Sequence, residues 1–205
     1  MDKEQFLTHL KEGTKVFQNE AIEKAFRAID RADFVPADYQ IEAYEDYALP
    51  LGFGQTMSQP STVAFMLELL EPKNGDWVLD VGSGSGFSTA LLSHVVGKSG
   101  KVIGVEIVPE LVKFGQTNLA KYKLPQAKII SGKDLEIGFP EEAPYNRILV
   151  SAEAELISEE LLNQLKIGGI MVMPVNHELV QIRKTSETEI ETEEFPGFSF
   201  VPLIY

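Results

Sequence analysis

The segment that most constrains the fold is residues 78–86, which read VLDVGSGSG. A short apolar run ends there in glycines at alternate positions, and an apolar pattern of helical period follows over residues 88–96. Glycine permits the positive φ of a tight turn and lets a ligand approach the backbone without a Cβ in the way. The N–H groups at the start of the following helix can then face an anionic group. This succession of strand, glycine loop and helix predicts a nucleotide-binding type of turn.

The rest of the chain repeats the alternation of strand and helix. Apolar runs predict strands at residues 77–81, 101–106, 127–131, 147–150 and 170–174, and apolar stripes predict helices at 88–96, 109–122 and 158–166. Residues 179–183 and 188–195 predict a late hairpin, and residues 198–204 a final strand. Strands that alternate with helices form a parallel sheet covered on both faces. We therefore expect a three-layer, doubly wound, Rossmann-like α/β fold, with Trp77 buried at the start of its first strand.

The N-terminal part of the chain has a different pattern. Apolar stripes within residues 1–30 predict two helices. Residues 31–56 are rich in aromatic side chains and are interrupted by prolines and glycines, so we expect them to be irregular. A further helix should begin near Pro60, because proline is favoured at a first helical position. With no linker between these parts, we expect a single domain over residues 1–205, in which residues 1–56 form a cap on a core of residues 57–205.

An acidic residue at the end of the second predicted strand supports a nucleoside ligand. Glu106 follows Gly82 by 24 residues, and in a nucleotide-binding sheet that position holds a carboxylate against the ribose hydroxyls. A dinucleotide fingerprint would place its third glycine at position 87, which is Phe87 here. Asp80 precedes the loop, and a carboxylate attracts an ammonium group rather than a pyrophosphate. For the glycine loop by itself, a tight turn without a ligand remains the alternative.

Several other segments resemble one known family. Residues 54–60, GQTMSQP, lie just upstream of an apolar helix. They are similar to the signature of bacterial protein-L-isoaspartate O-methyltransferases, which are class I enzymes that use S-adenosylmethionine. Five more segments fit the same family in the same order: RADFVP at 31–36, YED at 44–46, APY at 143–145, QLKIGG at 164–169 and FVPL at 200–203. The resemblance covers residues 20–205.

The resemblance implies a methyltransferase sheet of seven strands, mostly parallel, with a reversed last strand. It also implies transfer of a methyl group from S-adenosylmethionine to the α-carboxylate of isoaspartyl residues in damaged proteins. The resulting methyl ester then collapses to a succinimide, and hydrolysis of the succinimide partly restores aspartate. Ser58 matches the family's active-site serine and should orient the substrate carboxylate; the alternative is that it only caps the helix that follows. The expected cofactor-binding residues are Thr56, Met57, Asp80, Gly82, Ser83, Gly84, Gly86, Glu106, Ile107, Gly132 and Asp134.

The chain departs from the family pattern in three places. Lys133 and Asp134 stand in a segment that usually reads Gly-Asp-Gly, and Asn146 replaces an aspartate. Glu153 and Glu155 lie in a turn that is usually rich in alanine, which predicts extra negative charge near the substrate mouth. Two alternatives stay open: a related methyltransferase that acts on another carboxylate, an amine or a small molecule, and a non-catalytic protein that binds S-adenosylmethionine.

The composition of the chain excludes several classes of binding partner. The formal net charge of −13, from 18 Lys and Arg against 31 Asp and Glu, disfavours a nucleic-acid substrate. The chain has no cysteine and its three histidines are far apart, so we expect neither a disulfide nor a metal site. It has no apolar run of about 18 residues and does not start with a signal-peptide pattern. We expect a cytoplasmic, monomeric enzyme whose partners are isoaspartyl-containing proteins, with no role at a membrane.

Overall fold

A seven-stranded sheet forms the centre of the molecule. The structure is a computed structural model and describes residues 1–133 and 136–204. The strands are β3 (Trp77–Val81), β4 (Lys101–Glu106), β5 (Ala127–Ser131), β6 (Tyr145–Val150), β7 (Leu165–Val175), β8 (Glu178–Lys184) and β9 (Ile190–Pro196). Their order across the sheet is β5-β4-β3-β6-β7-β8-β9. The strands from β5 to β7 pair in parallel, and β8 is antiparallel to both of its neighbours.

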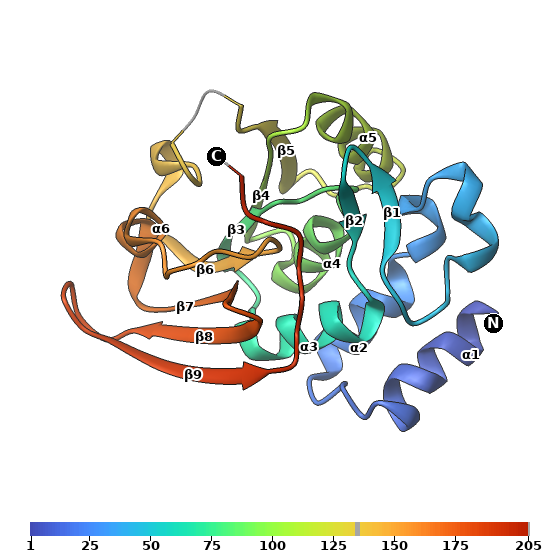
Figure 1. Ribbon diagram of the computed structural model, residues 1–205, viewed down its shortest axis with the longest axis horizontal. Coiled ribbons are helices and arrows are strands. Elements are labelled where there is room, and N and C mark those ends of the chain that lie inside the picture. The colour runs from blue at the N-terminus through green and yellow to red at the C-terminus, as the bar shows by residue number, and fades with distance from the viewer. Residues whose placement is uncertain (134–135, 205) are drawn as a thin grey trace.

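Helices cover the two faces of this sheet (Figure 1). They are α1 (Lys3–Thr8), α2 (Glu20–Ala28), α3 (Pro60–Leu70), α4 (Phe87–Val96), α5 (Pro109–Leu119) and α6 (Glu159–Gln164). Side chains of a strand alternate between its faces, and neighbours in β3 accordingly enter different cores. Val78 packs in the cluster that contains α1 to α5, whereas Leu79 packs in the cluster that contains α6. The predicted three-layer α/β fold is thus confirmed.

The N-terminal segment is more regular than its sequence predicts. Two helices are present within residues 1–30, and the first continues as a π-helix over His9–Gly13. Residues 31–56 were expected to be irregular, which is wrong: they contain two 3₁₀-helices (Arg31–Phe34 and Ala37–Glu42) and most of a hairpin of β1 (Leu49–Gly52) and β2 (Gln55–Met57). The glycines at 52 and 54 do not interrupt this hairpin. They adopt positive φ at its tip and so make the turn.

The cap and the core share one hydrophobic cluster. Phe87, at the start of α4, lies 5.7 Å from Phe26 and 5.5 Å from Phe34, measured between ring centroids. Phe34 stacks in turn on Tyr122 at 5.7 Å. These contacts hold the N-terminal segment against the helix that follows the glycine loop, and they favour the predicted single domain.

Three further expectations are corrected. The reversed strand is β8, not the last strand, because β9 pairs antiparallel with β8 and therefore runs in the direction of β7. Residues 198–204 form no strand; Pro202 makes an isolated bridge to Glu153 while the segment crosses the edge of the sheet. Trp77 is 42% exposed because it lies at the rim of the sheet, where the Lys101 ammonium sits 5.0 Å from its ring centroid.

Two predicted helices end earlier than expected. The helix predicted to reach residue 122 ends at Leu119, and the one predicted to reach residue 166 ends at Gln164, where β7 begins at once. Within the described parts of the chain, no helix has the length and apolar character needed to cross a membrane.

Candidate active site

The glycine loop turns the chain sharply from β3 into α4. Gly82, Gly84 and Gly86 have φ values of 75°, 50° and 86°, which is the left-handed region that favours glycine. The amides of Gly82 and Ser83 both donate to the carbonyl of Val105 in β4, at 2.9 and 3.1 Å. The loop is therefore fixed to the neighbouring strand, with its backbone at the carboxyl edge of the sheet.

Glu106 ends β4 and faces this loop. Its Oε2 accepts a hydrogen bond from the Gly84 amide at 2.9 Å, and its Oε1 accepts one from the Val108 amide at 2.9 Å. The residue is 6% exposed. An ionised carboxylate has about four acceptor positions, so two bonds to the backbone leave capacity for the hydroxyls of a ligand. The predicted pairing of the glycine loop with an acidic residue is present in the structure.

An open cavity of about 710 Å³ lies against the loop and Glu106. We call it the nucleoside cavity. It lies where the strand order reverses between β3 and β6, the position at which open α/β sheets bind their ligands. Of the predicted cofactor-binding residues, it is lined by Thr56, Gly82, Gly84, Glu106, Ile107 and Gly132.

A second opening adjoins the nucleoside cavity. This acceptor groove has an open volume of about 940 Å³ and is lined by Ala48, Thr56, Ser58, Gln59, Thr62, Ser151 and residues 197–201. A smaller space of about 480 Å³ lies between the two and is lined by Met57, Ser58 and Ser83, among others. Thr56 and Ser151 line all three spaces. Ser58 therefore stands where the groove meets the smaller space, which shares Thr56 and Ser151 with the nucleoside cavity.

The backbone around Ser58 is held from the N-terminal cap. Arg31, which is 1% exposed, donates from Nη1 to the Ser58 carbonyl at 3.0 Å. Asp46 accepts the amide of Ser61 at 2.9 Å. Burial lowers the pKa of the Arg31 guanidinium to about 9, against the opposing charge of Asp46. The guanidinium is thus still positively charged at neutral pH, and it fixes the segment that carries Ser58.

The capping alternative for Ser58 is not supported. The N-cap residue of α3 is Gln59, and its side chain makes no capping hydrogen bond. Asp46 serves the Ser61 amide in the first turn instead. The half-buried Ser58 hydroxyl is therefore left for the groove and the space beside it.

Asp80 and Gly86 occupy other places than predicted. Asp80 is 0% exposed; its Oδ2 accepts from the hydroxyls of Ser88 at 2.7 Å and Thr89 at 2.6 Å. Burial raises the pKa of Asp80 to about 6, although these hydroxyls oppose the shift. Among the described residues that line the three spaces, neither Asp80 nor Gly86 occurs. Both hold the start of α4, and Asp134 lies outside the described residues.

Sequence reasoning missed part of the lining. The nucleoside cavity is also lined by Leu51, Gln55, Val81, Val105, Glu136, Ile137, Gly138, Ser151, Ala152 and residues 201–204. Ser151 carried a usable signal, because it follows the apolar strand β6 directly and so lies at the same edge as the glycine loop. Residues 201–204 lie far from the loop in sequence, and no local pattern marks them as cavity residues.

Among the described residues, none of the departures from the family pattern belongs to the lining of the groove. Asn146, at the start of β6, accepts the Trp77 amide at 2.9 Å, at the opposite edge of the sheet from the loop. Glu153 accepts hydrogen bonds from backbone amides, and Glu155 is exposed. Neither glutamate is among the described residues that line the three spaces. The expected extra negative charge near the substrate mouth therefore comes from Glu153, whose Oε2 accepts from the amide of the groove residue Phe200, and not from a side chain that lines the groove. Lys133 is exposed, and its amide donates to the Ser131 hydroxyl at 3.4 Å.

Within residues 1–133 and 136–204, no group of three or more His, Asp or Glu side chains is placed to hold a metal ion. The nucleoside cavity instead offers backbone amides, an acceptor carboxylate and apolar walls. A mostly parallel sheet of seven strands, with a glycine loop after β3 and an acidic residue ending β4, defines a class I, S-adenosylmethionine-dependent methyltransferase.

Within that class, the chain belongs to the protein-L-isoaspartate(D-aspartate) O-methyltransferase family, whose sequence model matches residues 1–205. It is 45% identical over 188 residues to the protein-L-isoaspartate O-methyltransferase of Methanopyrus kandleri, covering 89% of this chain and 83% of the relative. It is 43% identical over 184 residues to that of Fervidobacterium nodosum, covering 88% and 92%.

A crystal structure from Plasmodium falciparum, assigned as a protein-L-isoaspartate O-methyltransferase in complex with S-adenosyl-L-homocysteine, has the same fold. It matches 100% of this chain and 99% of its own, with a TM-score of 0.87 and 25% identity.

Proposed function

We propose that the chain transfers the methyl group of S-adenosylmethionine to the α-carboxylate of L-isoaspartyl residues in damaged proteins. Its membership of the family supports this activity. The observation that carries the proposal is the position of Ser58, which lines both the acceptor groove and the smaller space that adjoins the nucleoside cavity. A methyl donor in the cavity and a carboxylate in the groove would face each other across this residue.

The residues of the nucleoside cavity fit S-adenosylmethionine. Gly84 brings bare backbone to the cavity wall; a Cβ built on it would lie 3.2 Å from the Leu51 side chain, which lines the same wall. Glu106 would accept the ribose hydroxyls, and Ile107 gives an apolar surface for the adenine. Bound there, the cofactor would supply an electrophilic methyl group on a sulfonium, with the neutral thioether as the leaving group.

The chain needs no general base for this reaction. The acceptor is a carboxylate with an ordinary pKa of about 4, so it is already ionised at neutral pH. What the protein contributes is position. Ser58 would donate its hydroxyl hydrogen to one carboxylate oxygen and so direct the other toward the cavity, with Thr56 and Ser151 beside it. Fixing two reactants in this way is worth up to about 7–11 kcal/mol in favourable systems.

A methyl-transfer assay tests the proposed activity. Tritiated S-adenosylmethionine is offered with an isoaspartyl peptide and, separately, with its aspartyl twin. We expect label in the isoaspartyl peptide alone. Labelling of neither peptide, with S-adenosylhomocysteine still bound, would favour another acceptor or a non-catalytic protein.

The Ser58→Ala variant tests the role of the serine. Loss of a hydrogen bond to a charged acceptor should lower kcat by about 10- to 100-fold. Affinity for S-adenosylhomocysteine, measured by calorimetry, should stay within about twofold, because Ser58 is absent from the described lining of the nucleoside cavity. Full activity, or an equal loss of turnover and cofactor affinity, would contradict this role. Thr62→Val, also in the groove, is the matched control.

A further inference from the structure

Residues 197–204 form a segment that we call the C-terminal strap. Figure 1 shows it in red, leaving β9 and running past the edge of the sheet toward the C-terminus. Residues 197–201 line the acceptor groove, and residues 201–204 line the nucleoside cavity. The strap belongs to no strand of the sheet, and all of its residues are exposed or half-buried. Phe198, Phe200 and Leu203 pack against the core clusters without being fully buried, so backbone hydrogen bonds must also hold the strap over both spaces.

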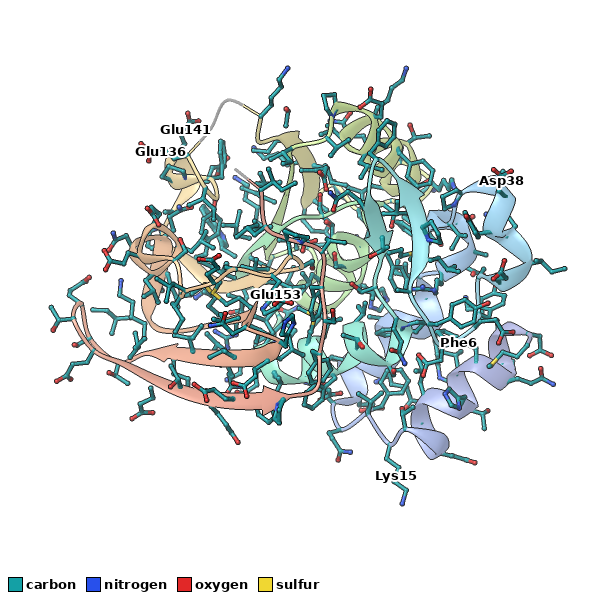
Figure 2. The ribbon with its side chains drawn as sticks, viewed as in Figure 1. Phe6, Lys15, Asp38, Glu136, Glu141 and Glu153 are labelled. Atoms are coloured by element: carbon teal, nitrogen blue, oxygen red, sulfur yellow. The ribbon has the colours of Figure 1, made fainter. Side chains whose placement is uncertain are left out.

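Glu153, in the loop after β6, holds the middle of the strap with its backbone. Its amide donates to the Val201 carbonyl at 2.8 Å, and its carbonyl accepts from the Leu203 amide at 2.7 Å. Any residue at position 153 could make these two bonds. The side chain adds a third, because Oε2 accepts from the Phe200 amide at 3.3 Å. Figure 2 shows Glu153 beside the strap.

The other carboxylate oxygen binds a separate segment, the turn between β7 and β8. Oε1 accepts from the His177 amide at 3.1 Å and lies 3.1 Å from its Nδ1. The His177 carbonyl in turn accepts from the amide of Phe198, also in the strap, at 3.1 Å. One carboxylate thus joins three stretches of chain: the loop after β6, the β7–β8 turn and the strap. The side chain is largely shielded, with 15% of its surface accessible.

We propose that Glu153 is a positioning residue that fixes the strap across the groove and the nucleoside cavity, and thereby sets the affinity for the peptide without contacting it. The expected change in KM for the peptide rests on the proposed function. The carboxylate is required because both oxygens accept from a backbone N–H. A glutamine of the same shape would turn its NH₂ group toward one of these donors and lose that bond.

The test compares Glu153→Gln with Glu155→Gln, a matched control on the same loop whose side chain is exposed. For Glu153→Gln we expect the rate of amide hydrogen exchange at Phe200 and His177 to rise at least about tenfold, because that is the effect of losing one hydrogen bond to a charged acceptor. KM for the isoaspartyl peptide should rise by about the same factor, with kcat within about twofold. The control should match the unmodified protein in both readouts.

Unchanged exchange at these amides in Glu153→Gln, or faster exchange with an unchanged KM, would overturn the proposal. An equal fall in kcat, or faster exchange across β3 to β7, would show a general structural role and would overturn it as well. Glu153→Ala, which removes both acceptors and keeps the backbone bonds, should exceed Glu153→Gln in every readout. Amide exchange can be measured without turnover. If the unmodified protein were inactive, the proposed function would be refuted, but the exchange rates would still test whether Glu153 holds the strap.

Discussion

The glycine loop and the C-terminal strap both line the nucleoside cavity, but they are held in place by different means. The loop is buried: Ser83 and Ser85 are 4% and 2% exposed, and a Cβ on Gly86 would lie 2.9 Å from the Ile129 side chain. The strap has no fully buried residue and depends on partly buried contacts, such as Phe198 on Phe65, and on hydrogen bonds from two distant turns. The glycine loop is therefore a rigid wall of the cavity, fixed by close packing, whereas the strap is a wall that can open at a small cost in free energy.

The largest expected effect is at the rigid wall. Gly86→Ala must place a side chain at φ 86°, with its Cβ 2.9 Å from Ile129 and 3.1 Å from the Gly115 carbonyl. Left-handed strain and overpacking together should lower the free energy of unfolding by about 4 kcal/mol. Urea denaturation measures this. Gly54→Ala is the control, because its φ is 73° but no atom lies within 4 Å, so it should cost about 1 kcal/mol. Equal losses would mean that close packing does not hold the loop.

The titration of Asp80, which is buried under the glycine loop, gives a second test of this rigid wall. Its pKa is raised from 3.8 to about 6 by burial, so the folded state favours the protonated acid. The stability that it contributes is full below pH 3.8 and is lost as the pH rises through about 6, a change of up to about 3 kcal/mol. Asp80→Asn keeps a neutral group, so its stability relative to the unmodified protein should rise between pH 4 and pH 7.

Denaturation at several pH values, with the exposed Glu155→Gln as control, tests this expectation. A stability difference that is constant with pH would contradict a buried, protonatable Asp80 under the loop.

The same contrast explains what the sequence could predict. The turn from β3 to α4 depends on residues close in the chain, so the spacing of Asp80, Gly82 and Gly86 was enough to place it, and Glu106 followed from the next strand. Spacing does not say where a side chain points, which is why Asp80 was assigned to a ligand although it binds Ser88 and Thr89.

Contacts between distant parts of the chain were not predictable. The strap lies 47 residues from Glu153 at the Phe200 bond, and nothing in its local pattern distinguishes an edge strand from a segment held by a carboxylate. An extended apolar stretch at the end of the chain therefore predicted a strand. The reversed direction of β8, by contrast, has a local cause, because only Asn176 and His177, both at positive φ, separate β8 from the antiparallel β7.

The smallest expected effect lies in the strap itself. Phe198 stacks on Phe65 of α3, with 5.6 Å between ring centroids and an interplanar angle of 6°. Phe198→Leu keeps apolar contact but loses the aromatic pair, worth about 1 kcal/mol. Amide exchange at Phe200 and Leu203 should rise about fivefold, while exchange in the core strands stays unchanged.

Phe195→Leu is the matched control, because Phe195 meets the same Phe65 ring edge-on at 5.4 Å but lies in β9. It should loosen the end of β9 and leave exchange at the amides of Phe200 and Leu203 close to the original rates. If both variants raise amide exchange in the strap equally, the strap moves together with β9. The mobile segment would then begin before residue 197 and would extend beyond the residues that Glu153 holds.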